Sequence, residues 1–213
     1  ADGTVAPAAG WATGKRIRFQ KDAGNPSAAG PDTEGVTVDD AGFVYAASER
    51  DNSAKAVNFN VVLKVDPNAA GPDLVALQEW DLTATLPAVG ANLGIEAVEW
   101  VADADLGGLW DVNTGAVYDP ARYPLHGDGL FFVAVEDRGR VFAVALNSDG
   151  THRLVADVTP GLTGVMALDY DAVLGALWAV CDDGCSNAAA LIDFNGTAEP
   201  TVTGFRSPAG PPV

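Results

Sequence analysis

The chain has 213 residues, of which 48% are apolar and 19% charged, and its formal net charge at pH 7 is −17. This balance is typical of a globular protein and excludes an intrinsically disordered one. The 29 acidic residues against 12 basic ones argue against binding to nucleic acids or anionic membranes, because such binding depends on Lys and Arg contacts with phosphates.

The acidity has two interpretations. It keeps an exported protein soluble, or it includes carboxylates that bind calcium. No apolar run approaches the roughly 20 residues of a membrane-spanning helix. The start of the chain lacks the basic and apolar segments of a signal peptide, and its first residue is Ala. We therefore expect either that a leader was removed or that the sequence is a fragment.

The first part of the chain predicts one isolated strand and then a group of four. Residues 1–14 are rich in Ala and Gly and are expected to be peripheral, whereas Lys15–Asp22 predicts a strand. Turn signals at Asp39–Gly42 and Asp66–Asp73 separate the next apolar runs. These runs predict four strands: Gly35–Asp39, Phe43–Ser48, Val61–Asp66 and Leu74–Leu82.

Two further groups of four strands follow the first. The second group is predicted at Glu96–Val101, Leu130–Glu136, Val141–Leu146 and Arg153–Val158. An insertion, residues 102–129, interrupts its first hairpin, and a loop of this length is usually functional or a lid. The third group is predicted at Val165–Tyr170, Ala176–Cys181, Ala188–Phe194 and Pro200–Phe205.

Repetition at this period predicts an all-β fold, a β-propeller of four-stranded antiparallel blades. Residues 15–213 are expected to form one propeller domain, with three blades and an additional N-terminal strand. A closed propeller needs at least about four blades. The domain is therefore expected to be incomplete, and a missing segment or a partner chain would complete the ring.

Acidic residues recur at matching positions of the repeats. Glu34 and Glu96 both stand at the start of the first strand of their repeat, which in a propeller lines the central channel. Converging carboxylates there would suit calcium, which takes six to eight oxygen ligands. Met166 occupies the corresponding place in the third repeat. The alternative is that each Glu forms a hydrogen bond with the backbone of the next blade.

A second acidic set follows the second strands of the repeats. Glu49, Glu136 and Asp137 are secondary candidates for metal ligands. Arg50 and Arg138 lie beside these acids. They either form local ion pairs that fix the turns or bind a phosphate near the calcium through bidentate hydrogen bonds.

The two cysteines, Cys181 and Cys185, lie in the segment CDDGCSN. This separation allows a disulfide if the turn brings the two Cα atoms close enough, as is expected of an exported protein. A metal site with two thiolates is the alternative, but no second Cys or His pair is present to complete four ligands.

Several motifs together resemble the esterase-like-phytase family of secreted bacterial propellers. They lie in PDTEGVTVDDAGFVYAASERDN, EWDLTATLPAVGANLGIEAVEWVADADL, YDPARYPLHGDGLFFVAVEDRGRVFAVALN and VMALDYDAVLGALWAVCDDGC. The likeness runs from about residue 16 to residue 213 and depends on the order of short motifs. It implies an exported propeller, secreted or at the cell surface, with calcium near its channel and hydrolysis of phosphate esters or other esters.

A serine hydrolase triad is not expected. The chain has no GxSxG motif and only two histidines, His126 and His152. His152 lies in a predicted turn, which favours a surface role, and His126 lies at the end of the insertion, where a role as acid or base has no nucleophile beside it. Among the five tryptophans, Trp100 and Trp178 lie within strands and are expected in the core. Trp110, in the insertion, is the candidate for stacking on a ligand.

Three functions follow from these observations. The first is calcium-assisted hydrolysis of a phosphate ester, with Glu34 and Glu96 as ligands and Arg50 or Arg138 holding the phosphate. The second is a non-catalytic extracellular module that binds a partner or small molecule through the insertion around Trp110. The third is a lactonase-type propeller enzyme with one divalent ion, in which Asn52 and Asn92 would be amide ligands.

Overall fold

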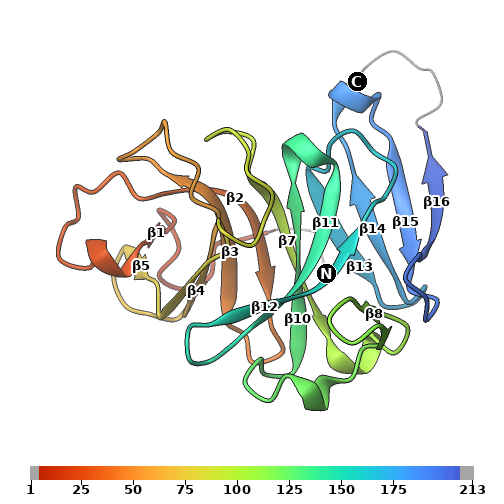
Figure 1. Ribbon diagram of the computed structural model, residues 1–213. Coiled ribbons are helices and arrows are strands. Elements are labelled where there is room, and N and C mark those ends of the chain that lie inside the picture. Colours follow the sequence, from red (N-terminus) through yellow and green to blue (C-terminus); the bar gives the residue numbers. More distant parts are fainter. Residues whose placement is uncertain (1–4, 207–213) are drawn as a thin grey trace.

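The computed structural model describes residues 5–206, and the fold of this part is all-β. Twelve of the strands form three four-stranded antiparallel sheets, and each sheet follows chain order from its first strand to its last (Figure 1). The first strands of the three sheets are neighbours, because β7 of the second sheet contacts both β2 and β13. The predicted grouping into three sets of four antiparallel strands is therefore confirmed.

The three sheets are named in chain order. The first sheet consists of β2 (Pro31–Val38), β3 (Val44–Asp51), β4 (Val61–Val65) and β6 (Gln78–Asp81). The second sheet consists of β7 (Ile95–Ala102), β10 (Gly129–Val135), β11 (Arg140–Leu146) and β12 (His152–Val158). The third sheet consists of β13 (Ala167–Asp171), β14 (Ala176–Val180), β15 (Ala189–Asp193) and β16 (Thr201–Phe205).

Short elements connect these sheets. Two small sheets pair β1 (Arg16–Arg18) with β5 (Asp73–Val75) and β8 (Trp110–Asp111) with β9 (Ala116–Val117). The helical turns are all 3₁₀: η1 (Gln20–Asp22), η2 (Asp103–Asp105), η3 (Pro120–Arg122), η4 (Glu136–Arg138) and η5 (Asp183–Cys185). Within residues 5–206, no helix has the length and apolarity that crossing a bilayer requires.

Two predicted strands differ from the observed ones. The strand expected over Lys15–Asp22 is limited to β1, after which the chain turns into η1. The strand expected over Leu74–Leu82 is divided into β5 and β6, because the chain changes its hydrogen-bonding partner between them. Ala76 N–H donates to the carbonyl of Arg18 in β1, whereas Leu77 N–H donates to the carbonyl of Lys64 in β4.

The second sheet lies between two hydrophobic cores. Phe131 and Val133 of β10 pack toward Tyr45 and Trp80 of the first sheet. The alternate residue Phe132 belongs to the core shared with the third sheet, where its ring stacks on Phe194 at 5.5 Å. Side chains of a strand point alternately to its two faces, so a strand covered on both faces is apolar throughout. The run GLFFVAV, buried at every position, has this character.

The outer face of the first sheet is covered by the chain that precedes it. Phe19, which is fully buried between β1 and η1, packs with Val61 and Leu63 of β4, and Phe59 lies beside it. The outer face of the third sheet is more open. There the rings of Trp178 and Phe205 lie 5.1 Å apart, and Phe205 is 44% exposed.

Gly35 allows β2 and β7 to approach closely. A Cβ atom at this position would lie 2.7–3.0 Å from backbone atoms of Ala97 and Val98 in β7. Such distances are shorter than any carbon side chain tolerates, so the absence of a side chain is required here.

The insertion, residues 102–129, is a packed part of the core. Leu106, Leu109, Tyr118 and Tyr123 are all buried in the core between the second and third sheets. Val112 N–H also donates a hydrogen bond to the carbonyl of Val155 in β12. The aromatic and aliphatic residues of the insertion therefore contribute to the core between the second and third sheets.

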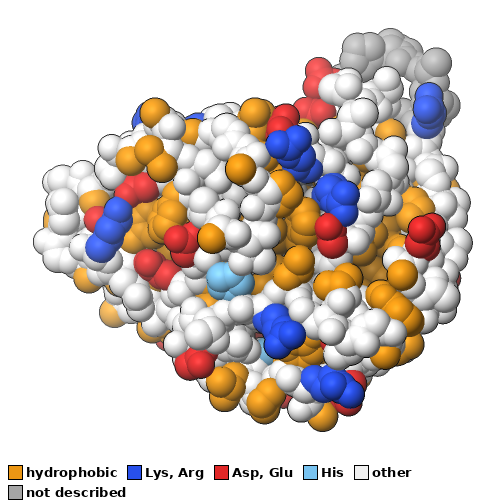
Figure 2. All heavy atoms as spheres, in the orientation of Figure 1, with side chains coloured by type: hydrophobic (Ala, Val, Ile, Leu, Met, Phe, Trp, Pro, Cys, Tyr) orange, Lys and Arg blue, Asp and Glu red, His pale blue; other side chains and the backbone are white. Residues whose placement is uncertain are grey.

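The surface shows no continuous basic patch on the face drawn in Figure 2. Lys and Arg side chains stand singly there, and several lie beside acidic ones (Figure 2). Arg140, for example, donates to the carboxylate of Asp157 at 2.8 Å.

Candidate metal centre

Five carboxylates meet where the inner strands of the first and second sheets begin. The start of β2 lies beside the end of β3, as shown by the pairing of Pro31 with Asp51. The start of β7 likewise lies beside the end of β10, where Ile95 pairs with Val135. The five residues of this carboxylate cluster are Asp32, Glu34, Glu49, Glu96 and Glu136.

Glu34 and Glu96 are both extra residues at β-bulges. In the first sheet, Thr33 pairs with Ser48 and Gly35 with Ala47, which leaves Glu34 without a cross-strand partner. In the second sheet the pairing shifts in the same way and passes over Glu96. A bulge redirects a side chain away from the regular alternation of the strand. The two residues predicted to be equivalent from the sequence therefore have equivalent backbone positions.

The geometry of three carboxylates suits a common ion. Asp32, Glu34 and Glu49 each offer an oxygen, and these atoms all lie within 4.8 Å of one another. Oxygens on opposite sides of one calcium ion are about 5 Å apart, because each binds at about 2.3–2.6 Å. Hard oxygen donors at this spacing are the type of ligand set that calcium requires.

Burial and the neighbouring carboxylates raise the pKa of Glu96 and of Glu49. The pKa of Glu96 is raised to about 8, first by burial and then by the negative charges of Glu34, Glu136 and Glu49, and its protonated form shares a hydrogen bond with Glu136. Burial also raises the pKa of Glu49. The hydrogen bond that Gly94 N–H donates to Glu49 at 3.2 Å lowers this pKa, but its effect is smaller than that of burial. Like charges gathered in a partly buried site favour protonation or the arrival of a cation.

Arg50 is the basic residue paired with this cluster. Its guanidinium forms ion pairs with Asp32 and, at 3.5 Å, with Glu49, and it also donates to the side-chain oxygen of Asn92. The Arg50 Nε is buried without a hydrogen-bond partner among the residues that the structure describes. One guanidinium leaves most of the negative charge of five carboxyl groups uncompensated, so a divalent cation fits the site electrostatically.

The remaining predicted ligands lie at the edge of the cluster. Asp137 forms an ion pair with Arg138 at 3.7 Å, and both side chains are more than 40% exposed. Arg138 also donates to the carbonyl of Ala88 at 3.0 Å. The ion pair of Arg138 with Asp137 corresponds to the first interpretation of the sequence, in which Arg138 fixes the local turn. Binding of a phosphate by Arg138 stays a prediction.

Other residues singled out in the sequence have separate surroundings. Cys181 and Cys185 are joined by a disulfide across η5, with their Cα atoms 6.0 Å apart. His126 is buried, and its ring contacts Tyr118 and Asp103 at 2.8 and 3.0 Å. The His152 ring lies 2.7 Å from the Thr85 hydroxyl and is partly buried, so the expected surface role is wrong: β12 carries it against the chain that follows β6.

Trp110 has little space for a ligand. The cavity beside it holds about 20 Å³ and is lined by Phe194 and Val158, among others. A cavity of this size accommodates about one water molecule and no sugar ring. Trp100 and Trp178 are only partly buried, so their expected place in the core is only partly correct.

The sequence reasoning missed Asp32 as a member of the cluster, whereas it named Asn92 as a candidate amide ligand. Asp32 stands two residues before Glu34, ahead of the expected strand, and Asn92 lies in the chain leading to β7. Asn52 donates to Asp32 at 3.1 Å, so both asparagines considered as amide ligands lie near the carboxylates. The chain matches no protein-family model and no curated protein.

The raised pKa values predict that the calcium-free protein loses stability as the pH rises. The pKa of Glu96 in the folded state, about 8, lies above its value in the unfolded chain. Between pH 5 and 8 the folded state therefore keeps a proton that the unfolded state has released, and the free energy of unfolding falls with pH. We expect Glu96→Gln to remove about 1–2 kcal/mol of this change, after allowance for solvent screening.

Thermal melts in chelator at pH 5, 6, 7 and 8 measure this effect. Glu199→Gln, at an exposed position far along the chain, serves as the matched control and should keep the wild-type pH profile. Parallel profiles for the wild type and Glu96→Gln would contradict the assignment.

Proposed function

We propose that the three sheets are consecutive blades of a β-propeller of the esterase-like-phytase type. The support is their common strand order, the contacts of β7 with β2 and β13, and the matching bulges at Glu34 and Glu96. Further blades, from a longer chain or from a partner, would pack on the partly exposed outer face of the third sheet and complete the ring. The disulfide and the acidity support a secreted or cell-surface location.

The function that the geometry supports best is binding of one calcium ion by the carboxylate cluster. The observation that carries this proposal is the convergence of bulge-directed Glu34 and Glu96 with Asp32 and Glu49, where Arg50 supplies the ion-paired cation within residues 5–206. Asp32, Glu34 and Glu49 would supply the first oxygens. Glu96 and Glu136, which form a hydrogen bond with each other, would become available as ligands when Glu96 loses its proton.

The proposed activity of this site is hydrolysis of a phosphate ester. A bound divalent ion supplies Lewis acidity toward a substrate oxygen and lowers the pKa of a water molecule. Arg50 is oriented by Asp32 and Asn92 and carries the positive charge nearest to the cluster. A phosphate oxygen approaching the carboxylates would meet this guanidinium, which suits recognition of phosphate.

Hydrolysis of a lactone is the second candidate. The observation that favours it is the place of Asn52 and Asn92 beside the carboxylates, because amide and carboxylate oxygens together form a mixed ligand set for a divalent ion. A lactone has no phosphate group, so this activity does not require Arg50.

Calorimetric titration of chelator-treated protein with calcium tests the proposal. We expect binding of one ion and a melting temperature that rises with the logarithm of the calcium concentration. Glu34→Gln combined with Glu96→Gln should abolish both effects, whereas Glu199→Gln should leave both unchanged. Absence of binding heat together with an unchanged melting temperature would refute the calcium site.

Turnover assays then separate the candidate activities. Release of inorganic phosphate from phosphate monoesters, dependent on calcium and lost in Arg50→Ala, would support the phosphate-ester hydrolase. Opening of a lactone without phosphate release would support the second candidate. Calcium binding without turnover of either substrate class would identify a non-catalytic binding module.

A further inference from the structure

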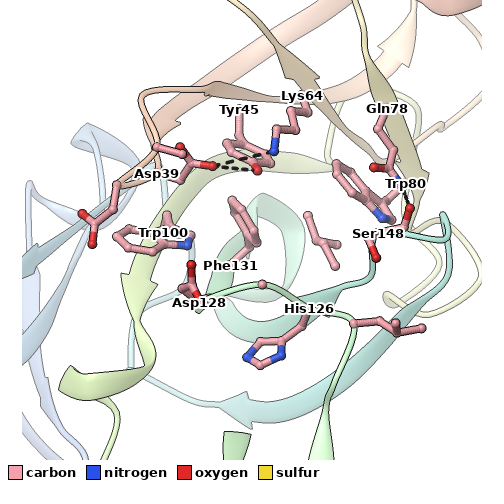
Figure 3. Close-up of a pocket in the computed structure, with 15 residues that line it drawn as sticks. Asp39, Tyr45, Lys64, Gln78, Trp80, Trp100, His126, Asp128, Phe131 and Ser148 are labelled. Carbon is pink, nitrogen blue, oxygen red and sulfur yellow. Dashed lines mark hydrogen bonds and ion pairs between the residues drawn. The ribbon is translucent and has the colours of Figure 1, made fainter.

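A second cavity lies at the opposite ends of the strands that carry the carboxylate cluster. It holds about 230 Å³ between the first and second sheets, next to the β2–β3 turn and the chain that leads into β10. Glu34 and Glu96 stand near the starts of β2 and β7, whereas this cavity lies where those strands end. We call it the aromatic cleft (Figure 3).

Four aromatic rings form the apolar wall of the aromatic cleft. The rings of Tyr45 and Phe131 have centroids 4.4 Å apart, and Tyr45 and Trp80 are stacked at 6.2 Å. The Trp80 indole N–H donates to the carbonyl of Asn147 at 2.9 Å and so fixes that ring. The fourth ring, Trp100, belongs to β7 and is only partly buried.

Trp100 is held at the mouth of the cleft by the backbone of β10. A Cβ atom at Gly129 would lie 2.6 Å from the indole nitrogen of Trp100, so the ring rests directly on this glycine. Figure 3 shows the indole nitrogen on the side of Asp128, with Phe131 beside the ring. The indole therefore presents a partly open aromatic surface next to a carboxylate.

Polar groups of several kinds surround the aromatic wall. The Asp40 and Asp128 carboxylates and the Ser148 hydroxyl are exposed at the mouth and offer hydrogen-bond acceptors and a donor. Gln78 lies across the cleft, and its side-chain amide donates hydrogen bonds to the carbonyls of Asn147 and Ser148. The side-chain oxygen of Gln78 is left as an acceptor. Lys64 contributes an ammonium group.

The charged groups of the cleft disfavour an anionic ligand. Three carboxylates, of Asp39, Asp40 and Asp128, face one ammonium group, so an anion would be repelled. The cleft already contains a cation of its own. The Lys64 ammonium lies 5.3 Å from the centroid of Tyr45 in the aromatic wall and 3.8 Å from the Asp39 carboxylate.

We propose that the aromatic cleft binds one neutral saccharide unit. A pyranose ring has an apolar C–H face that packs on an aromatic ring, and hydroxyl groups that donate to carboxylates and accept from amines and hydroxyls. Trp100 provides the aromatic surface, and Asp128, Asp40, Ser148 and Lys64 provide the matching polar groups. The volume lies below the range of about 300–1,000 Å³ for drug-sized ligands, which limits the occupant to a single ring.

Saturation-transfer NMR with glucose, galactose, mannose and N-acetylglucosamine, each at millimolar concentration, tests the proposal on the intact chain. We expect at least one sugar to receive magnetisation and to quench tryptophan fluorescence. Trp100→Ala should weaken binding about tenfold, which is near the upper effect of one aromatic contact. Trp110→Ala, a matched loss of an indole elsewhere, should change affinity less than twofold.

Further variants keep the test decisive. Asp128→Ala alters an exposed side chain, so it should fold as the wild type does and still weaken sugar binding. Glu34→Gln combined with Glu96→Gln should leave sugar binding intact, because the two sites lie at opposite strand ends. The proposal is overturned if no sugar binds, if Trp110→Ala weakens binding as much as Trp100→Ala, or if choline binds in place of the sugars.

Discussion

Replacing Gly35 with alanine is expected to lower the free energy of unfolding by about 2–3 kcal/mol, the usual cost of overpacking. The new methyl group would lie within 3.0 Å of the backbone of Ala97 and Val98, and backbone atoms cannot turn aside as a flexible side chain does. The first and second sheets must therefore separate where β2 meets β7. Urea unfolding measures the change.

The same substitution should weaken calcium binding, because Glu34 precedes Gly35 and Glu96 precedes Ala97. Gly204→Ala is the matched control. Gly204 also lies in a strand, β16, but a Cβ atom there would have no neighbour within 4 Å. Equal stability of the Gly35→Ala and Gly204→Ala proteins would show that the close approach of β2 and β7 carries no energetic cost.

Replacing Asp111 with alanine is expected to destabilise the protein by about 3 kcal/mol, because it leaves buried donors without an acceptor. The Asp111 carboxylate is fully buried and accepts hydrogen bonds from the Tyr123 hydroxyl at 2.8 Å and from the backbone and side chain of Asn113. These bonds join β8 to the segment around Tyr123 in the interior of the insertion. The melting temperature should fall by about 6–12 °C.

Two further variants serve as controls for Asp111→Ala. Asp111→Asn keeps an oxygen acceptor of the same shape and should lose less stability than Asp111→Ala. Asp105→Ala, at an exposed carboxylate in the same insertion, should unfold within about 0.5 kcal/mol of the wild type. A small effect of Asp111→Ala would mean that the insertion is held by its apolar residues alone.

Most strands could be predicted because their burial leaves a local pattern. The run from Leu130 to Val135 is apolar because both of its faces are covered, and the turns around Asp39 and Gly42 interrupt the apolar runs. The division of Leu74–Leu82 could not be predicted in this way. It depends on a change of pairing partner from β1 to β4, and β1 lies far away along the chain.

The candidate metal centre could be predicted only in part, because only some of its residues follow from a local sequence pattern. Repeat alignment placed Glu34 and Glu96 at equivalent positions, but the bulges that redirect them arise from cross-strand pairing and have no signature in either strand alone. Asp32 joins the site through the pairing of β2 with β3. The place of Trp100 at the cleft could not be predicted either. Alternation along a strand indicates which face a residue occupies, but it does not indicate whether two sheets leave a cavity between them at the strand ends.

The position of the second sheet between two cores makes the three sheets one cooperative unit. Phe131 and Phe132, adjacent in β10, secure the first and third sheets respectively, so neither flanking sheet can be released without exposing an apolar face of the second. Local unfolding should therefore proceed inward from the margin. β16, exposed at all five residues, would exchange its amide hydrogens first, and β10, buried at every position, would protect its amides until the whole molecule unfolds.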